Sequence, residues 1–124
     1  MEKQWIDITN NYSEDSRHYN GKYLEKSFLL DEEIEIQIYE VIEDGFDYTH
    51  EIFVNCKHFY GSTYPKNNPY ELFEQMKEDI YKESFKKNRY SKKFINEFCK
   101  KYNLVIAMDS YFSGFDDLFI DFDE

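Results

Sequence analysis

The alternation of isoleucine with acidic or amide residues over residues 33–38 constrains the fold more than any other feature of this sequence. Isoleucine occupies every second position, and the positions between hold Glu or Gln (Ile34, Ile36 and Ile38; Glu33, Glu35 and Gln37). Because successive side chains of a β-strand point to opposite faces of the sheet, this period of two predicts a strand with one apolar and one acidic face. Asp44-Gly45 follows as a turn signal, so we expect residues 31–60 to form a hairpin that seeds the fold.

The alternation changes phase after Ile38, where Tyr39 and Val41 become the apolar positions. A change of phase predicts a bulge or a sharp bend in this strand. The return strand is expected over residues 48–60, and apolar groups on both of its faces favour a central position in the sheet. The segment 23–30 fits either a strand or a short helix. Three shorter strands are expected at 4–9, at the continuously apolar and therefore buried run 104–108, and at 118–122.

Two helix-start signals precede apolar residues at helical spacing. Asn68, Pro69 and Glu71 provide a cap, a proline for the first turn and the acidic residue of a capping box. Ser91 provides a second cap after a basic break, a pattern compatible with one kinked helix or with two helices. The sequence therefore predicts an α+β fold, in which an antiparallel sheet of about four to five strands carries one or two helices, residues 69–102, on one face.

Composition indicates a single ordered domain, residues 1–124, with an acidic surface. Aromatic residues make up 20% of the chain, which predicts an aromatic-packed core, and the net charge is −11. Because binding to phosphates depends on Lys and Arg, this charge disfavours direct contact with nucleic acid or with an anionic membrane and favours a basic protein partner. The start of the sequence lacks the apolar stretch of a signal peptide, and we expect a cytoplasmic protein.

The acidic residues are unevenly distributed along the chain. Residues 1–65 hold 14 acidic and 5 basic residues (−9), residues 66–102 hold 6 and 10 (+4), and residues 103–124 hold 6 and none (−6). Solubility alone accounts for a surplus of acidic residues on a small aromatic-rich protein. If the helices cover one face of the sheet, however, the carboxylates are expected together with aromatic side chains on the opposite face and its edges. We therefore predict a partner-binding surface formed by Glu33, Glu35, Glu40, Glu43, Asp44, Asp47, Tyr111, Phe112, Asp116, Asp117, Asp121 and Asp123.

Two groups of residues have the chemistry of metal ligands but lack a recognised spacing. His50, Cys56 and His58 share one face of the return strand, and Cys99 could approach them from a helix. The C-terminal aspartates do not follow the spacing of a calcium-binding loop (Asp109, Asp116, Asp117, Asp121 and Asp123). Because the sequence has no nucleophile motif and no glycine-rich phosphate loop, we predict no catalytic residue, no metal, no cofactor and two reduced cysteines.

In its overall character the sequence resembles small inhibitor proteins of phages and mobile elements, such as anti-CRISPR and anti-restriction proteins. The shared features are a short single domain, a strong acidic charge, many aromatic residues and the lack of a catalytic motif. The resemblance implies a non-enzymatic nucleic-acid mimic that occupies the nucleic-acid-binding or catalytic surface of a nuclease in the cytosol of a host cell. Nuclease immunity proteins share this character and are the first alternative. A small ligand-binding or metal-dependent enzyme and a structural or regulatory dimer are further alternatives.

Overall fold

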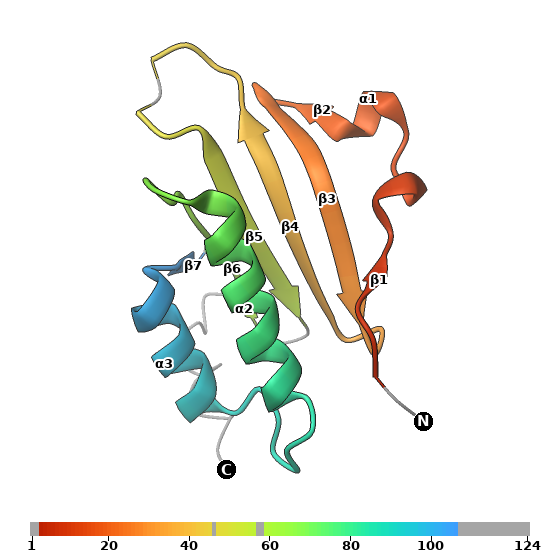
Figure 1. Ribbon diagram of the computed structural model, residues 1–124, viewed down its shortest axis with the longest axis vertical. Helices are drawn as coiled ribbons and strands as arrows, with labels where there is room; N and C mark the ends of the chain where they lie inside the picture. The colour runs from red at the N-terminus through yellow and green to blue at the C-terminus, as the bar shows by residue number, and fades with distance from the viewer. Residues whose placement is uncertain (1–2, 46, 57–58, 107–124) are drawn as a thin grey trace, which may run out of the picture.

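The computed structural model of the protein describes residues 3–45, 47–56 and 59–106, which form one antiparallel sheet with two longer helices on one face (Figure 1). In chain order the elements are β1 (Ile6–Asp7), η1 (Thr9–Asn11), α1 (Glu14–Arg17), β2 (His18–Tyr19), β3 (Lys22–Leu30), β4 (Ile34–Val41), β5 (His50–Cys56), β6 (Phe59–Thr63), α2 (Pro69–Glu83), α3 (Lys92–Tyr102) and β7 (Val105–Ile106). The strand order is β1-β3-β4-β5-β6-β7, and β2 also pairs with β3. The predicted α+β class is confirmed.

The described residues form a sheet of seven strands rather than the predicted about four to five. β1 and β7, with two residues each, fall within the strands predicted at 4–9 and 104–108. The strands that were not predicted are β2, whose two residues are too few for a periodic pattern, and β6, which was counted with β5 as one strand. The segment 23–30, which fitted a strand or a helix, belongs to the nine-residue strand β3. Its pairing with β4 supplies the context that its own sequence lacks.

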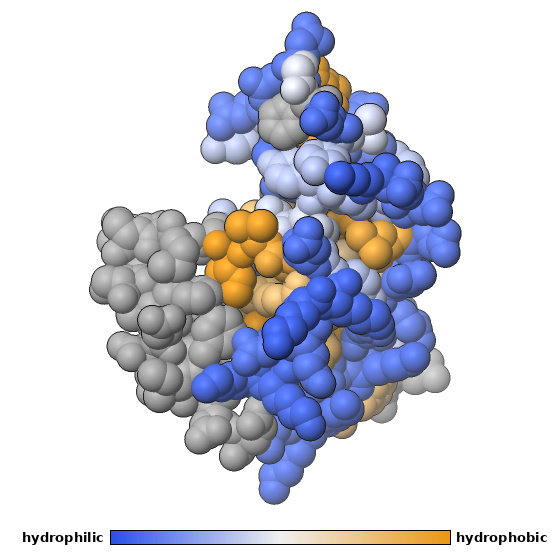
Figure 2. All heavy atoms as spheres, turned by 90° about the vertical axis from the view of Figure 1, so that its left-hand side faces the viewer, coloured by the Kyte–Doolittle hydropathy of each residue, from blue (hydrophilic) through white to orange (hydrophobic). Residues whose placement is uncertain are grey.

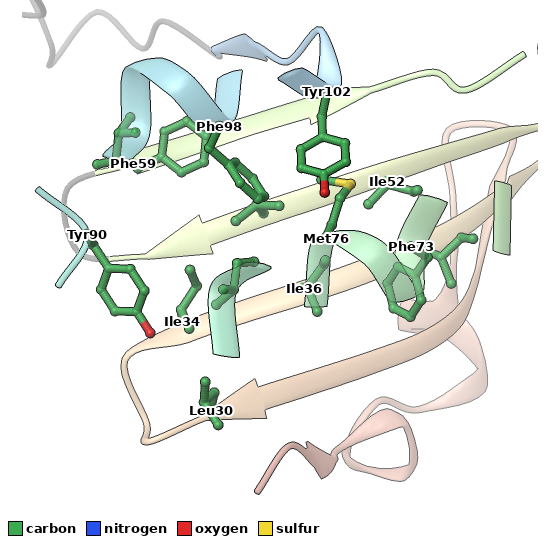
Figure 3. Close-up of a cluster of buried hydrophobic side chains, with 14 residues drawn as sticks. Leu30, Ile34, Ile36, Ile52, Phe59, Phe73, Met76, Tyr90, Phe98 and Tyr102 are labelled. Atoms are coloured by element: carbon green, nitrogen blue, oxygen red, sulfur yellow. The ribbon is translucent and has the colours of Figure 1, made fainter. Parts of the chain in front are cut away.

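The apolar face predicted from the isoleucine alternation is the centre of the core. Ile34, Ile36 and Ile38 of β4 are at most 2% exposed and belong to one buried cluster with Phe73 and Met76 of α2 (Figure 3). The same cluster includes residues of β5 and α3 (Ile52, Val54, Ile95, Phe98 and Tyr102). Full burial of an apolar side chain of this size contributes about 1.5–3 kcal/mol relative to exposure. This layer between sheet and helices therefore supplies most of the driving force for folding.

α2 and α3 are separate helices, one of the two arrangements compatible with the sequence. Pro69 opens α2 as predicted, but Asn68 has left-handed backbone angles and its side chain makes no capping hydrogen bond. Ser91 caps α3 as predicted, because its Oγ accepts a hydrogen bond from the backbone N–H of Phe94 at 3.3 Å. Tyr90, also left-handed, turns the chain between the helices and buries its ring.

The prediction of a bulge in β4 is wrong. β4 pairs with β5 without interruption up to Glu40, and the irregularity lies in β3, where the register shifts between Leu24 and Lys26. We call the face of the sheet that points away from α2 and α3 the outer face. Tyr39 lies on this face, paired with the buried Leu24 of β3, and its apolar ring there accounts for the change of phase. Apolar residues on the outer face thus account for the change of phase without a distortion of β4.

Residues 48–60 form parts of two strands rather than the one strand predicted. β5 ends at Cys56 and β6 begins at Phe59, and these two residues pair with each other. No turn was predicted there because the intervening Lys57-His58 contains none of the residues that favour turns. The predicted central position is confirmed for β5, which lies between β4 and β6.

The apolar run at 104–108 does not form a buried strand within the described residues. β7 comprises Val105–Ile106, pairs with β6 and leaves Val105 71% exposed. Figure 2, which views the molecule from the side of α3 and β7, shows a patch of hydrophobic atoms above the largely hydrophilic surface of α3. The strand predicted at 118–122 lies outside the described residues.

Two buried tyrosines provide a matched test of the hydrogen bonds that stabilise the fold. Tyr102 donates its hydroxyl to Asp79, whereas the buried hydroxyl of Tyr90 has no hydrogen-bond partner among the described residues. We expect Tyr102→Phe to lower the free energy of unfolding by about 1.5–3 kcal/mol, because the Asp79 carboxylate loses a donor, and Tyr90→Phe to leave it unchanged or raise it. Urea denaturation followed by circular dichroism measures both changes. Equal losses in the two variants would contradict this assignment.

Candidate functional site

Four of the predicted binding residues gather at one end of the sheet. Glu40 lies near the end of β4, and Glu43, Asp44 and Asp47 lie in the connection between β4 and β5, which extends beyond the sheet in Figure 1. All four are exposed, and none forms an ion pair with another described residue. We call these four residues the acidic end. Because neighbouring like charges repel each other, such a group favours a partner that supplies positive charge.

The opposite end of the sheet also carries carboxylates, but two of them have basic partners. Glu33, in the turn between β3 and β4, forms an ion pair with Arg89 from the connection between α2 and α3. Asp31 pairs with Lys3 at 2.9 Å. Glu33 is thus separated from the acidic end by the length of β4. Of the predicted surface residues that the structure describes, those without an ion pair or a hydrogen-bonded role in the fold lie together at the acidic end.

Glu35 has a structural role on the outer face of the sheet. Its Oε2 atom accepts three hydrogen bonds of 2.6–2.9 Å, from Tyr12, Ser27 and Gln37. Gln37 is 7% exposed and accepts in turn from the Tyr39 hydroxyl at 2.8 Å. A carboxylate with three donors is a fixed acceptor within the fold rather than a free surface charge. Glu35 therefore holds the segment around Tyr12 against the sheet.

The other predicted binding residues lie outside the described part of the chain (Tyr111, Phe112, Asp116, Asp117, Asp121 and Asp123). The same holds for the C-terminal aspartates considered as ligands of Mg²⁺ or Ca²⁺ and for His58. Of the predicted surface, the structure brings together the four residues of the acidic end, and it separates Glu33 and Glu35 from them.

His50 and Cys56 cannot bind one metal ion together, although they share a face of β5. Six positions along a strand separate two residues by about 20 Å. Cys56 and Cys99 pack against the hydrophobic core and are not bonded to each other, and burial raises the pKa of the Cys99 thiol to about 11. Within the described ranges, no three His, Cys, Asp or Glu side chains are grouped as metal ligands.

A groove lies between the start of α2 and β3, at a place that the sequence did not indicate. Its volume is about 450 Å³. It lies on the helix-covered side of the sheet, where α2 passes over β5 while β3 lies to the side of the helix (Figure 1). Its walls include aromatic rings and carboxylates (Tyr23, Glu25, Phe28, Tyr70, Phe73 and Glu74). We call it the α2–β3 groove.

Three side chains from different elements meet at the wall of this groove. The Tyr70 hydroxyl donates to the Glu25 carboxylate, at 2.8 Å from Oε1 and 3.0 Å from Oε2. The Nε2 atom of His50 lies 3.2 Å from Glu25 Oε1 and 3.0 Å from the Tyr70 oxygen. Burial and the hydrogen bond to Glu25 raise the pKa of Tyr70 to about 12, so this hydroxyl remains a donor at neutral pH.

The register shift in β3 creates this cluster. Glu25 is the additional residue between Leu24 and Lys26, and it points to the same side of the sheet as His50. A regular strand would place Leu24 and Phe28, four positions apart, on one face. The bulge places them on opposite faces, and nothing in the sequence of β3 alone signals this change. Glu25 and Tyr70 were therefore missed as candidate site residues.

No protein-family model, curated protein or solved structure matches this chain. In the described part of the chain, no helix combines the length and the hydrophobicity needed to span a bilayer. Function is therefore inferred below from the charges and contacts of the protein's own residues.

The protein is expected to lose stability above about pH 10. Burial raises the pKa values of Tyr39 and Tyr70 to about 12 in the folded protein, against about 10 for tyrosine in an unfolded chain. The resulting stabilisation is fully present below about pH 10 and is lost as the pH rises toward about 12. Urea denaturation at about pH 8 and about pH 11 measures the loss, which we expect Tyr39→Phe to reduce. An equal loss in the wild type and the variant would contradict the raised pKa of Tyr39.

Proposed function

We propose that the protein is a non-enzymatic inhibitor that binds a basic surface of a nuclease, its nucleic-acid-binding or catalytic surface, through the acidic end. The contrast between the two ends of the sheet carries this proposal. The four residues of the acidic end have no ion-pair partner among the described residues, whereas two of the three carboxylates in the turn at the other end, Asp31 and Glu33, are paired. On a chain with a net charge of −11, unpaired charge at one end attracts a basic surface.

A nuclease provides the kind of surface that these carboxylates match. Proteins that bind nucleic acids neutralise phosphates with Lys and Arg side chains. Carboxylates and phosphates both present acceptor oxygens to guanidinium and ammonium groups, so the acidic end can take the place of phosphates. Attraction between opposite charges raises the association rate, and salt weakens it by screening. Occupation of the basic surface would block the nucleic acid without any chemistry by the inhibitor.

Apolar groups accompany the charges of the acidic end. Ile42 is 46% exposed between β4 and Glu43. Tyr48, after Asp47, lies with its ring centroid 5.8 Å from that of Tyr64. Apolar anchors within a charged rim are typical of protein interfaces, because the desolvated centre supplies affinity and the rim supplies specificity. This combination supports a protein partner rather than a small ion.

Binding to a panel of purified nucleases tests the proposal. The panel contains CRISPR effectors, restriction endonucleases and toxin nuclease domains, and the class that is inhibited separates an anti-defence protein from an immunity protein. Biolayer interferometry and DNA cleavage are measured at about 50 mM and about 300 mM NaCl. We expect inhibition of at least one nuclease and an affinity at least about tenfold weaker at the higher salt concentration, because salt screens the charges of the acidic end.

A charge-reversal variant with a matched control locates the interface. The triple variant Glu43→Lys, Asp44→Lys, Asp47→Lys should weaken binding at least about 100-fold, because the acidic end then repels a basic surface. The control triple variant Asp15→Lys, Glu32→Lys, Glu97→Lys makes the same change in net charge at exposed positions elsewhere. Equal weakening by the two variants would mean that net charge alone acts, and the acidic end would lose its role.

A further inference from the structure

We infer that the α2–β3 groove binds the guanidinium group of an arginine side chain of the protein partner. This inference rests on the proposed function, because it requires a basic protein partner. The groove adjoins the acidic end: Glu40 lies opposite His50 in the pairing of β4 with β5, and His50 contacts the Glu25 carboxylate in the groove wall. A partner bound at the acidic end therefore meets the groove on the same surface.

The groove contains a carboxylate that is already oriented. Tyr70 and His50 both contact Glu25, so this side chain loses little freedom when a ligand binds. The Glu25 side chain nevertheless remains 28% exposed and can be reached from the groove. A guanidinium group carries a planar fork of N–H donors that matches the two oxygens of a carboxylate. Glu74 also lines the groove, but its Oε1 atom lies 3.7 Å from the Nζ atom of Lys77, so Glu25 is the carboxylate proposed to pair with the ligand.

The aromatic walls of the groove also suit a cation. Phe28 and Phe73 line the groove from β3 and α2, with ring centroids 6.0 Å apart. The protein's own Lys77 already uses this part of the wall, because its Nζ atom lies 3.7 Å from the centroid of Phe28 and 5.7 Å from that of Phe73. Cations bind over aromatic faces because the ring carries negative charge density there. Tyr23 and Tyr70 extend the same kind of wall.

The dimensions and the local charges fit one long basic side chain. A volume of about 450 Å³ falls within the range of small-ligand sites, about 300–1,000 Å³. Lys26, which also lines the groove, lies with its Nζ atom 3.7 Å from Asp7 and forms no ion pair with Glu25 among the described residues. Arginine fits better than lysine, because its guanidinium group both pairs with a carboxylate through two parallel bonds and stacks on aromatic rings.

Titration of the full chain with N-acetyl-arginine amide tests the site, with its neutral citrulline analogue as the control ligand. We expect amide chemical shifts in NMR to change around Tyr23, Glu25 and Tyr70, and the citrulline analogue to bind at least about fivefold more weakly. Glu25→Gln should weaken binding of the arginine probe at least about fivefold, because it removes the charge that the guanidinium group pairs with. Tyr70→Phe keeps the ring and releases the carboxylate, and a smaller loss is expected.

Glu71→Gln is the matched control, since Glu71 is exposed on the first turn of α2 and does not line the groove. Circular dichroism establishes that each variant is folded. Shift changes confined to the acidic end, or equal binding by Glu25→Gln and Glu71→Gln, would overturn the assignment of the groove. Tighter binding of spermidine than of the arginine probe in the groove would overturn arginine as its occupant.

The nuclease assay separates this inference from the proposed function. For a nuclease that the protein inhibits, Glu25→Gln should weaken binding at least about tenfold, while Glu71→Gln should not. A complex that is lost in the acidic-end variant but keeps its affinity in Glu25→Gln refutes the groove inference and leaves the proposed function intact. If no nuclease binds while the arginine probe binds through Glu25, the proposed function fails and the preference of the groove for guanidinium groups is supported.

Discussion

Burial of the isoleucine row of β4 under α2 and α3 is the interaction on which the other features depend. Ile34, Ile36 and Ile38 commit both helices to one face of the sheet, because this is where the largest apolar surface can be removed from water. With α2 held over the centre of the sheet, β3 lies to its side, and the α2–β3 groove forms between them. The outer face is left to a polar network around Glu35, which attaches the N-terminal segment through Tyr12.

The features of the fold that could be predicted from the sequence are those that depend on neighbouring residues. The alternation in β4 and the Ser91 cap are local, and the structure confirms both. The bulge in β3 and the connection between β5 and β6 depend instead on which strands pair. Tyr39 illustrates this limit of sequence-based prediction, because the change in apolar phase at Tyr39 was interpreted as a bulge in its own strand. The change in phase instead arises because Tyr39 lies on the outer face of the sheet, where it is paired with the buried Leu24 of β3.

The candidate site was predictable in residue type and less so in position. The sequence identified carboxylates as the dominant surface chemistry, but it could not show which of them find partners within the fold. Glu33 pairs with Arg89, 56 positions away, and Glu35 accepts from Tyr12, 23 positions away. What remains unpaired at the acidic end is therefore a property of the tertiary structure. The groove was even harder to predict from the sequence, because its Glu25 carboxylate is oriented by residues from β5 and α2.

The unequal pairing of charge at the two ends of the sheet separates negative from positive charge along the strands. The acidic end lies at one extreme of β4, and the basic connection between α2 and α3, with Lys86 and Lys87, lies toward the other (Figure 1). Among the described residues this separation of charge forms an electric dipole, and a dipole turns in the field of a charged surface before contact is made. The protein would approach a basic partner with its acidic end first. In the proposed complex, the lysines at the far end would contribute to orientation without being part of the interface.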